Sequence, residues 1–196
     1  MDIAKAKTQE VRAHLLKALD RSRPAPTPEA LLIRSLQQAA LPLNRSQLQQ
    51  ELGYLEAKGL LHHHEALWWL LPYGVDILEH SIEPTAGIPQ PNGWGPNELL
   101  HRKEVRSRIL TALYYARPHG IGNSILWRAL DDSDLPVTET ELARETHYLS
   151  GKELVELSGD LSHGWHAKLT AEGIDLMEYA TEPPPGIERI EKYWEG

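Results

Sequence analysis

The sequence contains no cysteine, no phenylalanine and only two methionines. Without thiols, the chain has no disulfides, no thiolate metal sites and no cysteine nucleophile. No apolar run approaches the roughly 20 residues that a membrane-spanning helix needs, and the segment Met1 to Lys5 leads into no signal-peptide pattern. We therefore expect a cytoplasmic protein that does not contact a membrane.

Positive charge is also scarce. The 196 residues carry 20 Lys and Arg against 28 Asp and Glu, which gives a formal charge of −8. This balance argues against non-specific coating of nucleic acid, which needs a broad cationic surface. Specific DNA recognition stays open, because it depends on local charge. The 41% of hydrophobic and 24% of charged residues are typical of a folded globular protein.

The chain resembles itself along most of its length. A shift of 94 residues aligns Glu10-Val11-Arg12 with Glu104-Val105-Arg106 and gives 19 identities over the 52 positions from 10 to 61. Beyond Leu61 the shift becomes 99, which indicates five inserted residues in the second copy. We interpret the chain as a tandem duplication. A Pro/Gly-rich stretch separates the copies, so we predict a first domain at 1–87, a linker at 88–97, a second domain at 98–182 and a Pro-rich C-terminal tail at 183–196.

Hydrophobic residues at helical spacing predict three helices at the start of each copy. The first ends at Arg23-Pro24 or Arg117-Pro118, and the second begins with Thr27 as N-cap in the first copy. The third begins with a capping box, at Asn44 to Gln47 and again at Thr138 to Glu141. Gly59 is expected to end the third helix of the first copy.

A short β-hairpin and a closing helix follow in each copy. The predicted strands are Leu60–His64 and Ala66–Leu70 in the first copy, and Leu154–Leu157 and Trp165–Leu169, around a loop at 158–164, in the second. The closing helices are predicted from Pro72 to about Ser81 and from the N-cap Thr170 to about Thr181. The predicted fold class is mainly α with small β-hairpins, that is, α+β.

Three helices, a hairpin and a closing helix resemble the winged-helix fold. The most specific segments are Leu142-Ala143-Arg144 through Leu149 into Lys152–Val155, and Leu169–Gly173. They resemble the corresponding parts of bacterial winged-helix regulators, and the chain is also similar to small winged-helix proteins of Mu-like transposable phages. The resemblance implies two tandem winged-helix domains, in which the third helix enters the DNA major groove and the hairpin touches the flanking backbone.

The exposed face of each third helix can be predicted from a helical wheel with Leu48 at the core centre. The predicted nucleic-acid-binding residues are Arg45, Ser46, Gln49, Gln50 and Gly53 in the first copy, and Thr140, Arg144 and His147 in the second. Gln pairs with adenine, Arg pairs with guanine, and small residues allow close approach to base edges. A plain solvated helix face is the alternative, because such faces also carry Ser, Gln and Arg.

The two copies differ in charge. Residues 1–92 hold 9 basic and 10 acidic residues (net −1), and residues 93–196 hold 11 and 18 (net −7). We therefore expect the first domain to be the better reader of double-stranded DNA. The acidic second domain is expected to serve self-association or a protein partner, unless the basic cluster Arg102-Lys103-Arg106-Arg108 outweighs its carboxylates.

Catalytic and metal-binding signals are few. The sequence has no G-x-S-x-G, no Gly-rich phosphate loop and no H-E-x-x-H, so we expect no catalytic residue, no cofactor and no metal. The run His62-His63-His64 raises the alternative of a metal site. Side chains alternate along a strand, however, so only His62 and His64 share a face, and a wing or an ordinary exposed strand is the better interpretation.

The sequence thus predicts a non-enzymatic, sequence-specific DNA-binding protein that acts as a transcriptional regulator. The alternative is an acidic tandem winged-helix scaffold or adaptor for proteins. A phage packaging or host-interaction component is a variant of that alternative, suggested by the phage resemblance. The residue types on the third helices separate the two, because a scaffold tolerates carboxylates or apolar anchors there.

Overall fold

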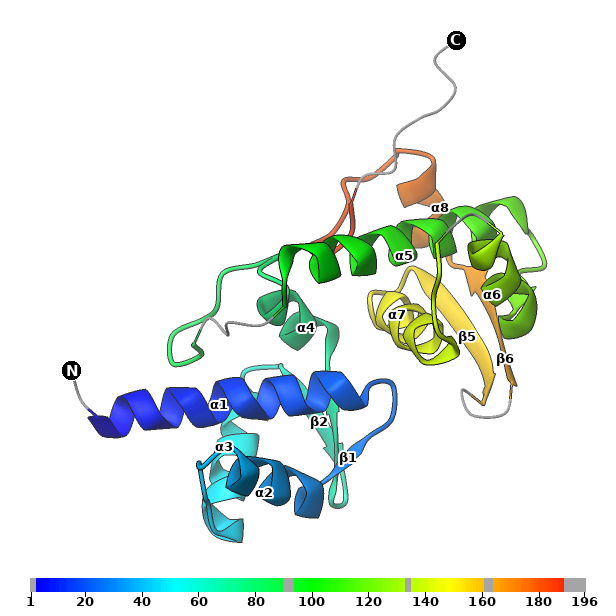
Figure 1. Cartoon of the computed structure of the whole chain (residues 1–196). Helices are drawn as coiled ribbons and strands as arrows, with labels where there is room; N and C mark the ends of the chain where they lie inside the picture. Colours follow the sequence, from blue (N-terminus) through cyan, green and yellow to red (C-terminus); the bar gives the residue numbers. More distant parts are fainter. Residues whose placement is uncertain (1–2, 90–93, 133–134, 161–163, 189–196) are drawn as a thin grey trace. The chain divides into compact units, whose positions relative to one another are not determined.

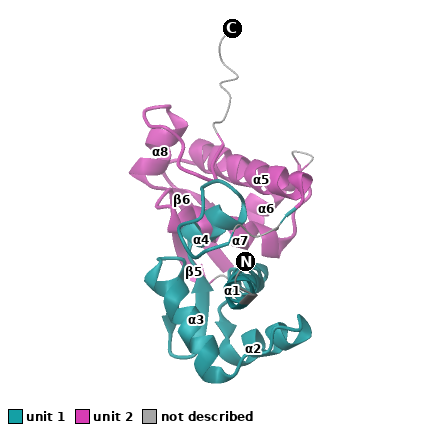
Figure 2. Cartoon of the chain, turned by 90° about the vertical axis from the view of Figure 1, so that its left-hand side faces the viewer, with its two compact units in different colours: residues 1–94 teal, residues 95–196 magenta. Residues whose placement is uncertain are grey.

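The computed structural model describes residues 3–89, 94–132, 135–160 and 164–188. The chain divides into two compact units, residues 1–94 and residues 95–196 (Figure 2). Residues 90–93 of the predicted linker and residues 189–196 of the predicted tail lie outside the described part. Within that part, every helix is too short or too polar to cross a bilayer.

The first unit packs helices against a small antiparallel sheet (Figure 1). Its elements are α1 (Ile3–Ser22), β1 (Thr27–Pro28), α2 (Glu29–Gln38), α3 (Arg45–Ala57), β2 (Leu61–His64), β3 (Leu67–Leu70) and α4 (Pro72–Leu78). The strand order is β1-β3-β2, so β2 and β3 form the predicted hairpin and β1 adds a third strand. Helix α1 contacts α2, β3 and α4.

The second unit repeats this order of elements (Figure 1). They are α5 (Pro96–Tyr115), β4 (Ile121–Gly122), α6 (Asn123–Asp131), α7 (Glu139–Gly151), β5 (Val155–Asp160), β6 (Gly164–Leu169) and α8 (Ala171–Met177). The strand order is β4-β6-β5, again antiparallel. The prediction of a mainly helical chain with small β-hairpins is confirmed, with one more strand in each sheet than expected.

Leucines at helical spacing build the core of each unit, as predicted. In the first unit Leu15 and Leu16 of α1 are 0% exposed, and so are Leu32 and Leu36 of α2. The corresponding positions in the second unit, Ile109, Leu110, Leu126 and Leu130, are at most 1% exposed. Burial of these side chains is the main stabilising contribution in each unit.

The predicted signals for the third helices are confirmed. In α3 the Asn44 side chain accepts from the Gln47 N–H, and the Gln47 side chain accepts from the Asn44 N–H. Thr138 and Glu141 form the same capping box at α7. Gly59 follows the end of α3 with a φ of +72°, the left-handed conformation that glycine adopts without strain.

The predicted start of the second helix is wrong by one residue, because Pro28 and not Thr27 takes the N-cap position. Thr27 is not an N-cap. Instead, Thr27 and Pro28 extend as β1 and pair with Trp68 and Leu67 of β3, and α2 begins at Glu29. Proline fits there because β1 is an edge strand, where the missing N–H leaves no partner unsatisfied. The tertiary pairing with β3 thus overrides the local capping signal.

The closing helices are shorter than predicted. Helix α4 ends at Leu78 and α8 at Met177, because His80 and Tyr179 adopt left-handed φ angles of 57° and 64°. At the end of α4 the Ser81 N–H donates to the Asp76 carbonyl over 2.8 Å, a helix-ending bond of the Schellman type. The chain therefore reverses direction there without a glycine.

Two predicted loop boundaries also need correction. Ile88, placed in the linker, is 5% exposed and belongs to the core of the first unit, and Pro96 is already the first residue of α5. In the second hairpin, β5 continues to Asp160 and β6 begins at Gly164, so much of the predicted loop 158–164 is strand. The second hairpin is longer than the first: its strands have six residues instead of four.

Candidate nucleic-acid interface

Helix α3 carries the predicted residues of the first copy on its exposed face. Leu48, Leu52 and Leu55 are 0% exposed and hold the opposite face in the core. The exposed side chains are those of Arg45, Ser46, Gln49 and Gln50, next to Gly53. A methyl group on Gly53 would meet no other atom within 4 Å. The face therefore presents two amides, a hydroxyl and a guanidinium, next to a glycine over which no other side chain lies.

A nearly buried carboxylate lies beside this face. Glu29 begins α2, and its side chain is 10% exposed. Its Oε2 lies 3.2 Å from Nε of Arg45, and Nε2 of Gln49 donates to both of its oxygens over 3.4 and 3.5 Å. Glu29 thus positions two of the predicted contact residues and offsets the charge of Arg45. Glu29 could not be predicted from the sequence, because partners 16 and 20 positions apart leave no local signal.

The β2–β3 hairpin carries the three exposed histidines, His62, His63 and His64. His63 stacks on Trp68 with ring centroids 4.6 Å apart, and its Nδ1 lies 2.7 Å from Oε1 of Glu56. Across the part of the chain that the structure describes, no three His, Asp or Glu side chains are grouped so as to hold a metal ion. The described geometry therefore gives the metal alternative no support.

Helix α7 presents a different face. Thr140 is exposed and His147 is half-buried, while the Arg144 side chain is 16% exposed and its Nε lies 2.8 Å from Oε1 of Glu145. At the repeat shift of 94, Glu139 takes the position of Arg45 and Ala143 that of Gln49. Ala143 itself is only 7% exposed. The second copy thus lacks the amide and guanidinium groups of the first at these positions.

The start of α7 is negatively charged. Burial opposes ionisation of Glu141, but hydrogen bonds from the Thr138 backbone and hydroxyl, and the nearby charges of Arg144 and His101, together lower its pKa. The carboxylate is therefore ionised at neutral pH. Because its pKa is lowered in the folded state, its stabilising contribution is present above the ordinary value and is lost as the pH falls through the lowered one.

The predicted basic cluster on α5 does not form a cationic surface. Arg106 is 0% exposed, and its Nε lies 2.7 Å from Oε2 of Glu145. The other three side chains are also paired: Arg102 with Glu98, Lys103 with Glu188 and Arg108 with Glu104. The reason is helical periodicity, because Arg102 and Arg106 fall on the same side of α5 as its buried apolar residues. The cluster therefore cannot outweigh the carboxylates of the second unit.

Both units share an arginine-centred contact set that the sequence analysis missed. Arg12 bonds Glu51 over 2.7 Å, donates to the Gly87 carbonyl over 2.7 Å and lies 3.7 Å from the ring of Tyr54. Arg106 makes the same three contacts, with Glu145 at 2.7 Å, the Gly186 carbonyl at 2.9 Å and Tyr148 at 3.7 Å. These residues are identical between the copies, and that identity was the available signal.

In each unit, these contacts bond the turn after the closing helix (α4 or α8) to the first helix (α1 or α5) and to the third helix (α3 or α7). The Tyr54 hydroxyl donates to the Ala86 carbonyl over 3.1 Å, and the Tyr148 hydroxyl does the same to Pro185. Gly87 has a φ of +85°, and a Cβ there would overlap the Tyr54 hydroxyl. The set is structural and adds no exposed group to the candidate interface.

Comparisons with protein-family models, with curated proteins and with solved structures give no match for this chain.

Proposed function

We propose that the chain is a non-enzymatic, sequence-specific DNA-binding protein that acts as a transcriptional regulator. In this proposal the two units are winged-helix modules that arose by duplication, and α3 of the first unit enters the major groove. The observation that carries the proposal is the exposed face of α3, where amides, a hydroxyl, a guanidinium and a glycine lie together without an exposed carboxylate among them.

The chemistry of this face fits the edges of base pairs. A Gln amide both donates and accepts, so it can pair with N6 and N7 of adenine, and Arg45 can reach guanine or a phosphate. The donation from Gln49 to Glu29 uses Nε2 of the amide and leaves the amide oxygen for a base. Gly53 and Ser46 add little bulk, which favours close approach of the helix axis to the groove floor.

The hairpin of the first unit supports the same orientation. His62 and His64 are exposed on β2, which follows α3 directly. Imidazoles donate hydrogen bonds and carry a positive charge when protonated, so they suit contacts with the phosphate backbone beside a groove. The second unit, with Glu139 and Glu141 at the start of α7, is assigned to self-association or to a protein partner.

One observation favours the scaffold alternative. Leu31 of α2 and Ile125 of α6 occupy equivalent positions in the repeat and are 53% and 64% exposed. Apolar side chains exposed at the same place in both units are suited to contact with another protein. This surface lies on the second helices, and DNA binding by α3 does not require it.

Selection from a pool of randomised DNA duplexes tests the proposal. The full chain is expected to enrich a common sequence and to bind it at least about 10³-fold more tightly than random duplex, the range of specific DNA readers. The affinities are measured by gel shift at a fixed salt concentration. A pool that shows no enrichment, at low as well as physiological salt, would contradict DNA reading and favour the scaffold.

Replacing Glu29 by glutamine is expected to steepen the salt dependence of DNA binding. The substitution frees Arg45 from its carboxylate partner, so the guanidinium becomes available for one more phosphate. The slope of log K against log salt should then grow by about 0.9, the value for one added phosphate contact. The measurement is a salt titration with the selected duplex and with random duplex.

The matched control for Glu29→Gln is Glu83→Gln, which makes the same charge change at an exposed position after α4. This control is expected to leave the slope unchanged. An equal slope for Glu29→Gln and the unsubstituted chain would contradict the added phosphate contact of Arg45.

A further inference from the structure

Glu29 sets the orientation of the Gln49 amide. Nε2 of Gln49 lies 3.4 and 3.5 Å from the two oxygens of the Glu29 side chain. A carboxylate offers only acceptors, so the amide presents its NH₂ group to Glu29. The reverse orientation would bring the amide oxygen up to the carboxylate oxygens, and these acceptors would repel one another. The chemistry of the pair therefore selects one of the two orientations of the amide.

The oxygen of this amide is left for a partner outside the chain. Within the described residues, Oε1 of Gln49 accepts no hydrogen bond. Oε1 is bonded to the same carbon as Nε2 but points away from Glu29, because the two atoms lie on different sides of the planar amide. The side chain is exposed on α3. The outward polar atom of Gln49 is therefore an acceptor.

The carboxylate of Glu29 has a well-defined position. Glu29 is the first residue of α2, its side chain is 10% exposed, and its backbone N–H donates over 3.2 Å to the Ala66 carbonyl in the hairpin turn. Its Oε2 also lies 3.2 Å from Nε of Arg45. An acceptor that is nearly buried and held by the backbone can orient Gln49 before a ligand arrives, which lowers the entropic cost of binding.

The second unit lacks this arrangement but has the same order of elements. At the repeat shift of 94, its residues at the three positions are Asn123 for Glu29, Glu139 for Arg45 and Ala143 for Gln49. The arginine-centred contact set, in contrast, has identical residues in both units. The fold therefore does not require the contacts of Glu29. Their presence in the first unit alone favours a role at the exposed face of α3.

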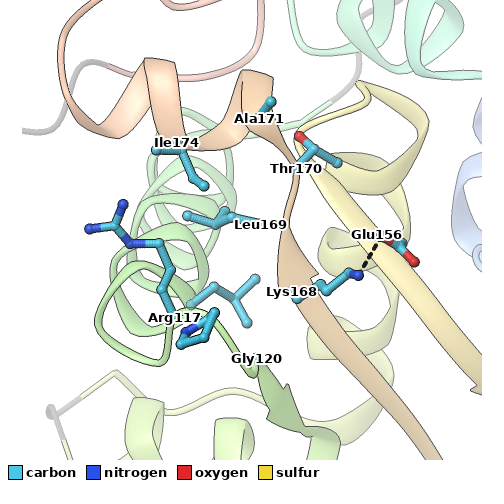
Figure 3. Close-up of a pocket in the computed structure, with 10 residues that line it drawn as sticks. Arg117, Gly120, Glu156, Lys168, Leu169, Thr170, Ala171 and Ile174 are labelled. Carbon is cyan, nitrogen blue, oxygen red and sulfur yellow. Dashed lines mark ion pairs between the residues drawn. The ribbon is translucent and has the colours of Figure 1, made fainter.

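The charged side chains at an open cavity of the second unit are already paired. The cavity lies between the end of α5, the strands β5 and β6 and the start of α8 (Figure 3). Nζ of Lys168 lies 2.9 Å from Oε2 of Glu156, and Nη1 of Arg117 lies 2.9 Å from Oε1 of Glu178. Figure 3 shows Arg117 and Lys168 on opposite sides of Leu169. The cavity therefore gives no support to phosphate binding by the second unit at this place.

We propose that Glu29 determines the base specificity of Gln49. By holding the amide oxygen outward, Glu29 makes Gln49 select a base pair that places an exocyclic amine opposite this oxygen, either N6 of adenine or N4 of cytosine. A pair that places O6 of guanine or O4 of thymine at that point is rejected, because two acceptors meet. This specificity rests on the proposed function, since it requires α3 to enter the major groove. Glu29 is a positioning residue and does not itself contact DNA.

Duplexes that lack a single exocyclic amine test this specificity. Selection with the full chain gives the bound sequence, and selection with Gln49→Ala identifies the base pair that Gln49 contacts, as the one at which the preference is lost. At that pair, purine replaces adenine, or pyrimidin-2-one replaces cytosine. The unsubstituted chain is expected to bind the amine-free duplex about tenfold more weakly, within the range for one good base contact. Gln49→Ala is expected to bind the two duplexes equally.

Glu29→Met assigns the orientation of the amide to the carboxylate. Methionine is of similar length but has no carboxylate, so the Gln49 amide can turn and donate to a neighbouring base acceptor. Loss of the amine is then expected to weaken binding only about threefold or less. Arg45→Met is the matched control, because it removes the other partner of Glu29 and keeps the contact with Gln49. It is expected to lower the affinity for both duplexes and to keep the full difference between them.

The outcomes separate this specificity from the proposed function. A selection without enrichment at any position would overturn both. Enrichment of a sequence that Gln49→Ala relaxes at no position, or equal affinity of the unsubstituted chain for the duplexes with and without the amine, would overturn the specificity alone. So would a Glu29→Met variant that keeps the full difference. Thermal unfolding verifies the fold of each variant, and the amine test of the unsubstituted chain does not depend on Glu29→Met.

Discussion

Replacing Gln49 and Gln50 together by glutamate is expected to lower specific DNA affinity by a factor of about 100 or more. Each amide loses its N–H donors and becomes an anion that faces base acceptors and phosphates. A good bidentate base contact contributes about 1–3 kcal/mol, so loss of two such contacts accounts for that factor. Both side chains are exposed, and glutamate suits a helix as well as glutamine does. A glutamate at position 49 also loses the hydrogen bond to Glu29 and faces its carboxylate, so thermal unfolding measures that repulsion separately from DNA binding.

The measurement is a gel shift with the duplex selected by the unsubstituted chain, together with thermal unfolding of each variant. Gln37→Glu with Gln38→Glu is the matched control, because it makes the same amide-to-carboxylate change at exposed positions of α2. The control is expected to keep its preference for the selected duplex over random DNA. Full affinity of the Gln49 and Gln50 variant would show that α3 does not read the groove.

Local signals explain what could be predicted of the fold. The capping boxes at Asn44 and Thr138 need only residues three positions apart, and the buried leucines follow the helical period. The strand β1 could not be predicted in this way. Thr27 and Pro28 are typical of a helix start, and only their pairing with β3, about 40 residues later, makes them a strand.

The exposed face of α3 was predictable for the same reason. Its residues follow from the position of Leu48 in the helical period, and the structure leaves all of them at the surface. The contacts of Glu29 with Arg45 and Gln49 were not predictable, because they require knowledge of how α2 packs beside α3. Side-chain partners across two helices depend on tertiary packing, which the sequence pattern does not specify.

The basic cluster on α5 shows a different kind of error. Arg102, Lys103, Arg106 and Arg108 are close in sequence, but the helix directs them to different sides. Arg106 lies four residues before Leu110 and three before Ile109, both of which are 0% exposed. The helical period, counted back from Ile109 and Leu110, places Arg106 on the buried side of α5. A buried arginine needs a carboxylate partner. That partner, Glu145, is identical between the copies, as is Arg106.

Removal of either partner of this buried pair is expected to destabilise the second unit strongly. Arg106 and Glu145 are 0% and 1% exposed and lie 2.7 Å apart. Arg106→Met or Glu145→Met leaves a buried charge without its main partner, which costs about 3–5 kcal/mol. The double substitution removes both charges of the pair and leaves Arg144, which is 16% exposed, without its carboxylate neighbour. It is expected to cost less than either single one, because apolar side chains of similar volume can replace a buried ion pair at little net cost.

The first unit supplies the matched control for this cycle. Arg12 and Glu51 form the same pair at the same 2.7 Å, but their side chains are 14% and 21% exposed, so water screens the charge that remains after substitution. Arg12→Met and Glu51→Met should therefore have clearly smaller effects than their counterparts. Native-state hydrogen exchange in the full chain measures the opening free energies of α3 and α7 separately. Equal losses in the two units, or single and double effects that simply add in the second, would contradict the role assigned to burial.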